Sequence, residues 1–171
     1  GATSNPPTTD WLETLEWIKL NTPENAVIAS WWDYGYWIQT MAERTTLIDN
    51  STISTWQIQD MAKMLLSTPV DSWNMLKEMN ADYVLVFVAG QKIGHAPDGQ
   101  QLYVLNGGGD ESKKAWFIRI AQMPIENYLE SDNMTGTNYF WNETLLGKMI
   151  PFTPLIYYND ELKKQANSYV P

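Results

Sequence analysis

The sequence predicts an α/β fold: a mainly helical single domain over residues 1–171, built around a small, largely parallel β-sheet. At 171 residues, the chain is long enough for one domain with a core of its own. Short apolar segments typical of strands, at 26–29 and 83–88, alternate with segments of helical periodicity. This is the order of βαβ units with right-handed crossovers. Because residues 83–88 are almost continuously apolar, we expect them in the middle of the parallel sheet.

The helices are predicted from apolar stripes bounded by capping residues or proline. The first begins after Thr8-Thr9-Asp10 and ends at Asn21 to Pro23. Further helices are predicted from Asp33 or Tyr34 to about Glu43 and over 55–66, 69–79, 110–123 and 138–149. Leu47-Ile48 adds a short strand, and residues 155–158 either form a strand or pack without one.

The glycine-rich segment 89–110 invites interpretation as a phosphate-binding loop. It lacks Lys and Ser/Thr at the positions that such a loop requires. We therefore expect a flexible hairpin or loop there.

Composition argues against several functions. The net charge of −9 argues against nucleic acid as a partner. The chain has no cysteine, which excludes a disulfide framework and a thiolate metal site. His95 is the single histidine and is interpreted as a loop residue.

The organisation of the chain suggests a part of a larger protein. No apolar run approaches the ~20 residues of a membrane span. The start, Gly-Ala-Thr-Ser-Asn-Pro-Pro, suggests a piece excised from a longer protein.

The most informative stretch is the pentapeptide WWDYG at 31–35. The strand at 26–29 should deliver it to the end of the sheet, where α/β folds place their sites, and Gly35 allows a sharp turn. One interpretation is a corner of the core, with both indoles packed and Asp33 capping the next helix. The other is a rigid polar pocket with two indole donors and one carboxylate acceptor, which suits a small hydroxyl group.

WWDYG is identical to the signature of the oligosaccharyltransferase catalytic subunit, a family that transfers an oligosaccharide from a lipid carrier to Asn in Asn-X-Ser/Thr sequons. Four further segments resemble that family: TLIDNST at 46–52, ADYVLV at 81–86, KKAWFIRI at 113–120 and LLGKM at 145–149. The resemblance runs from about residue 26 to about 150 and is to the short archaeal type. It implies that the chain is the C-terminal globular domain of a membrane enzyme with many spans.

Archaeal and eukaryotic members of this family carry a second motif, Asp-x-x-Lys-x-x-x-Met/Ile. The chain contains Asp-x-x-Lys three times, at 60–63, 110–113 and 160–163. Only Asp110 and Lys113 follow the glycine-rich loop and precede a Trp-x-Ile-Arg segment, as the family's copy does. Phe117 stands where Met or Ile is usual, with Ile118 next to it, so which of the two is the apolar residue stays open. The alternative for each copy is a surface ion pair worth a few tenths of a kcal/mol.

By resemblance, the residues that bind the sequon's Ser/Thr are Trp31, Trp32 and Asp33, whose polar groups would converge on its hydroxyl. Tyr34 and Gly35 would shape the turn. Asp110, Lys113 and either Phe117 or Ile118 would complete the site, the apolar side chain touching the threonine methyl. Such a pocket discriminates because an analogue without the hydroxyl leaves buried polar groups unpaired.

The resemblance places the catalytic parts outside this chain. The full-length enzyme would use a divalent cation (Mn or Mg) held by its membrane region, so no catalytic or metal residue is assigned here and the isolated domain should be inactive. Its partners would be an acceptor polypeptide with an Asn-X-Ser/Thr sequon and, through the membrane region, a lipid-linked oligosaccharide. The enzyme would lie in the cell membrane, with this domain on the extracytoplasmic side.

Two other functions fit parts of the sequence. A secreted carbohydrate-binding module without catalytic activity would share the aromatic richness and acidity, but such modules are usually β-sandwiches. A hydrolase could pair Asp33 with another carboxylate, although no spacing among the twenty acidic residues selects a partner.

Overall fold

The computed structural model describes residues 9–31, 38–39, 41–46, 55–105, 107–159 and 164–171. The chain divides into two compact units, one made of Gly1–Met61 and Trp73–Leu85 and the other of Ala62–Ser72 and Val86–Pro171. The division falls within α3 (Thr55–Leu66) and α4 (Pro69–Glu78), two helices whose predicted bounds are confirmed to within a residue. One domain over 1–171 stays a prediction.

The first unit is organised around a three-stranded parallel sheet with the order β2-β1-β3. Its strands are β1 (Val27–Ala29), β2 (Thr45–Thr46) and β3 (Tyr83–Val84). Ile28 of β1 pairs with Thr46 on one side and Tyr83 on the other. The expectation that 83–88 forms the central strand is therefore wrong. The central strand is β1, whose Ile28 and Ala29 are 1% and 0% exposed, whereas Tyr83 at the edge is 40% exposed.

Helix α1 (Thr9–Asn21) follows the predicted bounds and turns Trp11, Leu15 and Ile18 into the core. Its C-terminal carbonyls are satisfied by Arg44, a buried side chain just before β2. The Arg44 guanidinium donates to the Lys19 carbonyl at 2.7 Å and to the Thr22 carbonyl at 2.8 Å. A cation at this end also complements the helix dipole, so Arg44 links the end of α1 to the sheet.

The second unit contains a four-stranded antiparallel sheet with the order β4-β5-β7-β6. Strands β4 (Gly90–His95) and β5 (Gln101–Leu105) form the hairpin expected within 89–110, and His95 is exposed at the end of β4 rather than in a loop. Strands β6 (Thr153–Asn159) and β7 (Lys164–Val170) form a second hairpin, of which only a possible short strand was expected. Tyr103 of β5 pairs with Tyr169 of β7 and joins the two hairpins. The joining of the two hairpins into one sheet was not predicted, because β5 and β7 are distant in sequence.

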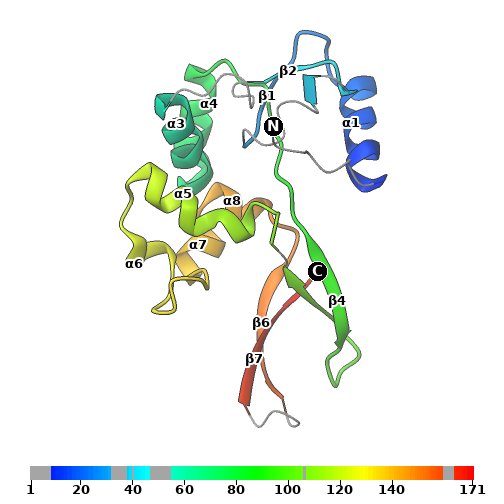
Figure 1. Ribbon diagram of the computed structural model, residues 1–171, viewed down its shortest axis with the longest axis vertical. Helices are drawn as coiled ribbons and strands as arrows, with labels where there is room; N and C mark the ends of the chain where they lie inside the picture. Colours follow the sequence, from blue (N-terminus) through cyan, green and yellow to red (C-terminus); the bar gives the residue numbers. More distant parts are fainter. Residues whose placement is uncertain (1–8, 32–37, 40, 47–54, 106, 160–163) are drawn as a thin grey trace, which may run out of the picture. The chain divides into compact units, whose positions relative to one another are not determined.

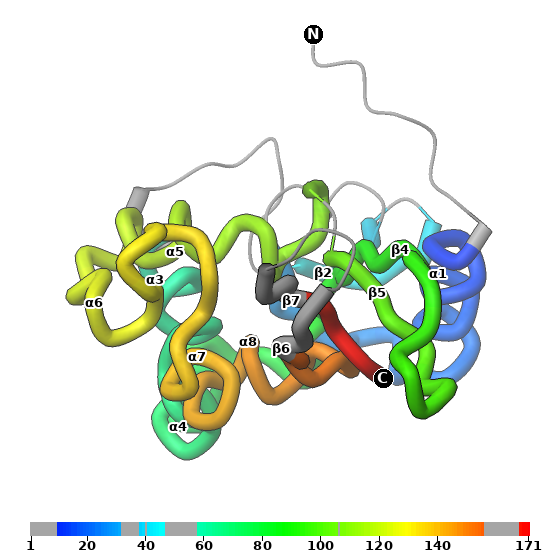
Figure 2. Tube along the Cα trace, turned by 90° about the horizontal axis from the view of Figure 1, so that it is seen from below, coloured from blue at the N-terminus to red at the C-terminus, as the bar shows by residue number. Residues whose placement is uncertain are grey.

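The helices of this unit lie together in both views (Figures 1 and 2). They are η2 (Glu111–Lys113), α5 (Lys114–Ala121), α6 (Ile125–Tyr128), α7 (Asn138–Glu143) and α8 (Leu145–Met149). The single helix expected over 138–149 is interrupted at Thr144, whose φ of −85° and ψ of 152° are extended. The Thr144 hydroxyl donates to the Phe140 carbonyl at 2.6 Å and accepts from the Gly147 N–H at 3.0 Å. It therefore closes one helix and caps the next. Throughout the part of the chain that the structure describes, we find no helix with the length and apolarity needed to cross a membrane.

The loop between α6 and α7 is held by Asp132. Its carboxylate accepts from the Thr135 hydroxyl at 2.6 Å and from the N–H groups of Thr135 and Met134 at 2.8 and 2.9 Å. These hydrogen bonds lower the pKa of Asp132 from 3.8 to about 2, and the bond from the Thr135 hydroxyl has the largest effect. Each bond favours the charged form of the carboxyl group.

We therefore expect the Asp132 carboxyl to titrate with a midpoint near pH 2 in an NMR titration. Because the folded-state pKa is depressed, its stabilising contribution is complete above the ordinary value of 3.8 and is lost as the pH falls toward 2. Over this range the amide signals of Met134 and Thr135 should shift together with the carboxyl. Asp132→Asn should abolish the transition, and a midpoint near 4 in the wild type would contradict the assigned bonds.

Candidate functional site

Trp31 is the one residue of the WWDYG motif within the described ranges. It follows β1 by two positions and is 2% exposed, in the first unit. The predicted delivery of the motif by the strand at 26–29 is confirmed for this residue, since β1 ends at Ala29 in the centre of a parallel sheet. The carboxyl ends of parallel strands meet at one edge, which is where α/β folds place ligands. The remaining motif residues, Trp32, Asp33, Tyr34 and Gly35, lie outside the described residues, so the pocket itself stays a prediction.

Asp110 lies in the second unit, where its side chain is 1% exposed. Its carboxylate accepts from the Phe87 N–H at 2.9 Å, and its own N–H donates to the Phe87 carbonyl at 2.7 Å. This two-point contact joins the segments on either side of the β4–β5 hairpin. A buried carboxylate with such partners stabilises the local backbone, so Asp110 has a structural role in addition to any role in binding.

Gly109 allows these segments to approach closely. A Cβ atom at this position would lie 2.8 Å from the Ala89 nitrogen and 3.2 Å from the Phe87 carbonyl oxygen. Both contacts are with backbone atoms, which cannot rotate away. The Asp110–Phe87 hydrogen bonds hold the two segments so close together that only glycine fits at position 109.

Lys113 is half-buried at the end of the 3-10 turn η2. Its N–H donates to the Asp110 carbonyl at 3.0 Å, the bond that defines such a turn, and side chains three residues apart eclipse one another there. Asp110 and Lys113 therefore share one side of the turn, although the regular α-helix expected from Asp110 onward begins only at Lys114.

Phe117 and Ile118, the two candidates for the apolar contact, are 0% and 1% exposed in α5. Both side chains contribute to the core rather than to a surface.

A buried ion pair beside the motif was missed by the sequence reasoning. The Lys114 ammonium bonds the Glu111 carboxylate, and each side chain is 7% exposed. Burial, together with the Glu111 charge, raises the pKa of Tyr169 to about 12. The i,i+3 spacing of Glu111 and Lys114 was visible in the sequence, but surface pairs have the same spacing.

The other copies of Asp-x-x-Lys differ from this arrangement. In the 60–63 copy, Lys63 is exposed and Asp60 half-buried on α3, and the 160–163 copy lies outside the described residues. Across the described ranges, no group of three or more His, Cys, Asp or Glu side chains could hold a metal ion.

Comparison with known proteins gives consistent matches. Residues 24–93 match the family described as the STT3/PglB/AglB core domain, a range that contains WWDYG. The chain is 36% identical over 130 residues to the Dictyostelium discoideum dolichyl-diphosphooligosaccharide–protein glycosyltransferase subunit STT3 and 35% identical over 143 residues to the Caenorhabditis elegans subunit. These alignments cover 76% and 80% of this chain but only 16% and 17% of the relatives. The chain thus spans about a sixth of their length.

Solved structures share the fold. The C-terminal globular domain of an oligosaccharyltransferase from Archaeoglobus fulgidus matches with a TM-score of 0.54 and 22% identity, over 98% of this chain and 100% of that one. A second A. fulgidus oligosaccharyltransferase, tethered with an acceptor peptide containing the NVT sequon, matches with a TM-score of 0.51 and 14% identity, over 93% of this chain and 25% of that one. At these identities the likeness concerns the fold alone, and it confirms the predicted α/β class.

Proposed function

We propose that this chain is the C-terminal globular domain of an oligosaccharyltransferase catalytic subunit of the short archaeal type, and that it recognises the acceptor sequon in protein N-glycosylation. One observation carries the proposal: WWDYG follows the central parallel strand of a segment, 24–93, that matches the STT3/PglB/AglB core domain. The short archaeal type rests on the resemblance of the sequence motifs alone.

In this proposal the WWDYG residues read the Ser/Thr of the sequon. The indole N–H groups of Trp31 and Trp32 and the carboxylate of Asp33 surround its hydroxyl. The burial of Trp31 supports a rigid pocket wall. Loss of the ligand hydroxyl leaves these groups unpaired, which is strongly unfavourable, whereas loss of the threonine methyl costs only ~1–3 kcal/mol.

In the second motif, Asp110 and Lys113 have different roles. Asp110 holds the loop through Phe87, so it positions the turn on which Lys113 lies. Lys113 then contributes its charge to the acceptor site. Because Phe117 and Ile118 are both buried, a methyl contact from either requires a shift of α5 that uncovers it.

The rest of the reaction is proposed to lie in the full-length enzyme. That enzyme resides in the cell membrane with this domain on the extracytoplasmic side, holds Mn²⁺ or Mg²⁺ outside this chain, and takes a lipid-linked oligosaccharide as donor. Solved A. fulgidus relatives carry an acceptor peptide in one case, and an inhibitory peptide with dolichol-phosphate in another. The isolated domain is inactive in this proposal because the donor and the metal are bound elsewhere.

The test uses the full-length enzyme in membranes with a labelled Asn-X-Thr peptide. Asp33→Ala and Lys113→Ala should each reduce transfer about 10–100-fold, the equivalent of a hydrogen bond to a charged group of about 1.5–3 kcal/mol. Asp71→Ala and Lys63→Ala replace exposed residues of the same types on α4 and α3 and should transfer like the wild type.

The preference for Thr over Ser provides a further readout. The ratio of transfer to Asn-X-Thr and Asn-X-Ser peptides should change in Lys113→Ala if the second motif reads the same residue. A folded Asp33→Ala enzyme that keeps full activity would rule out the pocket, and the tryptophan pair would then be a corner of the core.

A further inference from the structure

The second unit contains a cavity of 480 Å³ between the 130–136 loop, the start of α7, and strands β6 and β7. This volume is within the range of small-molecule sites, ~300–1,000 Å³. Six lining residues carry its chemistry: Glu130, Asp132, Asn138, Trp141, Asn142 and Tyr169. None of them belongs to the predicted sequon site.

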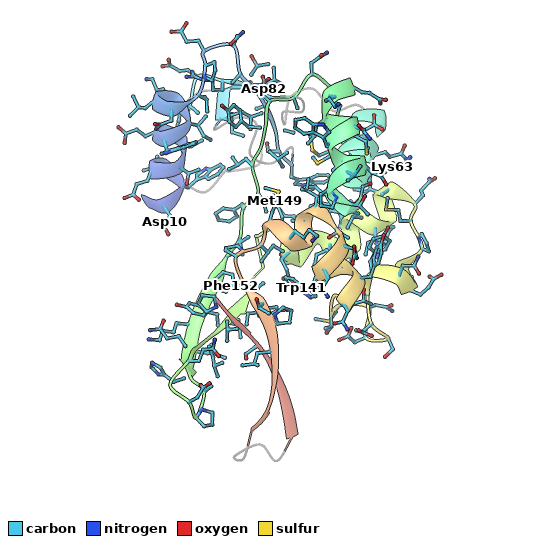
Figure 3. The ribbon with its side chains drawn as sticks, turned by 180° about the vertical axis from the view of Figure 1, so that it is seen from behind. Asp10, Lys63, Asp82, Trp141, Met149 and Phe152 are labelled. Atoms are coloured by element: carbon cyan, nitrogen blue, oxygen red, sulfur yellow. The ribbon has the colours of Figure 1, made fainter. Side chains whose placement is uncertain are left out.

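One wall of the cavity is aromatic. The rings of Trp141 and Tyr169 lie side by side, with centroids 5.5 Å apart and planes tilted by 49°. Figure 3 labels Trp141 on α7, beside β6 and β7. The Trp141 indole also makes an edge contact with Phe140, at 5.2 Å between ring centroids. With its pKa raised to about 12, Tyr169 keeps its phenolic proton at neutral pH and can donate as well as accept.

Polar and acidic residues also line the cavity. They include Glu130, Asp132, Asn138 and Asn142. The described residues that line the cavity include no Lys, Arg or His. An anionic ligand such as a phosphate or a nucleotide would be repelled, which leaves neutral and cationic ligands.

A metal ion fits the cavity poorly. The Asp132 carboxylate already accepts three hydrogen bonds, out of about four lone-pair sites on a carboxylate. Within the described residues, the cavity also holds no group of three His, Cys, Asp or Glu side chains that could bind a metal ion. A lining that combines aromatic rings with amide and carboxylate side chains instead suits a ligand that is apolar on one side and hydroxylated on the other.

We infer that this cavity binds a neutral sugar residue of an oligosaccharide. The C–H face of the sugar packs on Trp141 and Tyr169, and its hydroxyls bond the amides of Asn138 and Asn142 and the carboxylate of Glu130. The inference rests on the proposed function only for the source of the sugar, which would be the glycan that the enzyme transfers. The binding chemistry itself is independent of the sequon pocket.

The test measures binding of maltotetraose, mannotetraose and chitotetraose to the full-length enzyme by saturation-transfer NMR and calorimetry. At least one tetrasaccharide should bind saturably. The double variant Asn138→Ala/Asn142→Ala, which changes two exposed side chains, should weaken that binding at least about 10-fold through lost hydrogen bonds. Asn74→Ala, an exposed asparagine on α4 outside the cavity, should bind like the wild type.

Trilysine and Ca²⁺ serve as competing probes. Glu130→Gln should keep sugar binding within a few-fold, because an amide still accepts a hydrogen bond. Tighter binding of trilysine or Ca²⁺ that is lost in Glu130→Gln would overturn the inference, as would no saturable sugar binding or equal binding in the double variant. Transfer to the Asn-X-Thr peptide is assayed separately, so failure of the sequon pocket in Asp33→Ala and failure of this cavity are distinguishable.

Discussion

Replacing Gly147 by alanine should lower the free energy of unfolding by about 3 kcal/mol or more, the upper range for overpacking. A Cβ atom at this position would lie 2.0 Å from the Phe140 carbonyl oxygen and 2.8 Å from the Trp141 Cα atom. These are backbone atoms of α7, and Gly147 is on α8 directly across from them. The two helices would have to separate to admit the methyl group.

Helix propensity alone predicts that Gly147→Ala raises the free energy of unfolding. In an exposed helix, alanine is more favourable than glycine by about 1 kcal/mol. A loss of stability in Gly147→Ala would therefore come from tertiary contact alone. The measurement is urea unfolding of the 171-residue chain followed by far-UV circular dichroism.

Gly107→Ala is the matched control. A Cβ atom at Gly107 would meet nothing within 4 Å, and the backbone there does not require glycine. Its unfolding midpoint should be close to that of the wild type. A Gly147→Ala midpoint equal to that of Gly107→Ala would contradict the close approach of α7 and α8.

The second large effect is expected for Lys114→Met. The ammonium of Lys114 bonds the carboxylate of Glu111 and its carbonyl, the latter at 3.3 Å, and lies 5.8 Å from the centre of the Phe140 ring. Methionine has similar volume but leaves the 5%-exposed Glu111 as a buried charge without its partner. Breaking such a pair costs about 3–5 kcal/mol, mostly through the stranded charge.

A double variant distinguishes the loss of the ion pair from the cost of leaving one buried charge without its partner. Lys114→Met combined with Glu111→Leu removes both charges and should recover most of the lost stability, since apolar replacement of a whole buried pair is often neutral. It should also lower the pKa of Tyr169 from about 12 only in part, because burial is the larger cause of that shift. Lys113→Met, at the half-buried neighbour, should change the unfolding midpoint little. Equal destabilisation in the single and double variants would contradict this account.

Local sequence does not decide which of the adjacent lysines, Lys113 or Lys114, forms a buried ion pair. Lys113 and Lys114 both follow an acidic residue by three positions, Asp110 and Glu111. The resemblance selected the first pair, yet in the structure the ion pair that is fully buried is the second. The Asp110 carboxylate accepts a hydrogen bond from the Phe87 N–H. These partners are distant in sequence or depend on the packing of α7, and no spacing encodes them.

By itself, the sequence determined the features that depend on neighbouring residues. The helices at 9–21, 55–66 and 69–78 follow from apolar periodicity and polar or proline boundaries, and the strand before WWDYG follows from a short apolar run. A motif of five adjacent residues can likewise be read from the chain alone.

Only the tertiary structure decided the features that require distant residues to meet. The second sheet exists because Tyr103 pairs with Tyr169, the helix expected over 138–149 breaks because Thr144 bonds both of its halves, and the order of the parallel sheet places β1 rather than β3 in the centre. Each outcome is set by burial and hydrogen-bond satisfaction between segments. Such contacts override local propensity because they involve several kcal/mol, whereas propensities differ by only about 1 kcal/mol per residue.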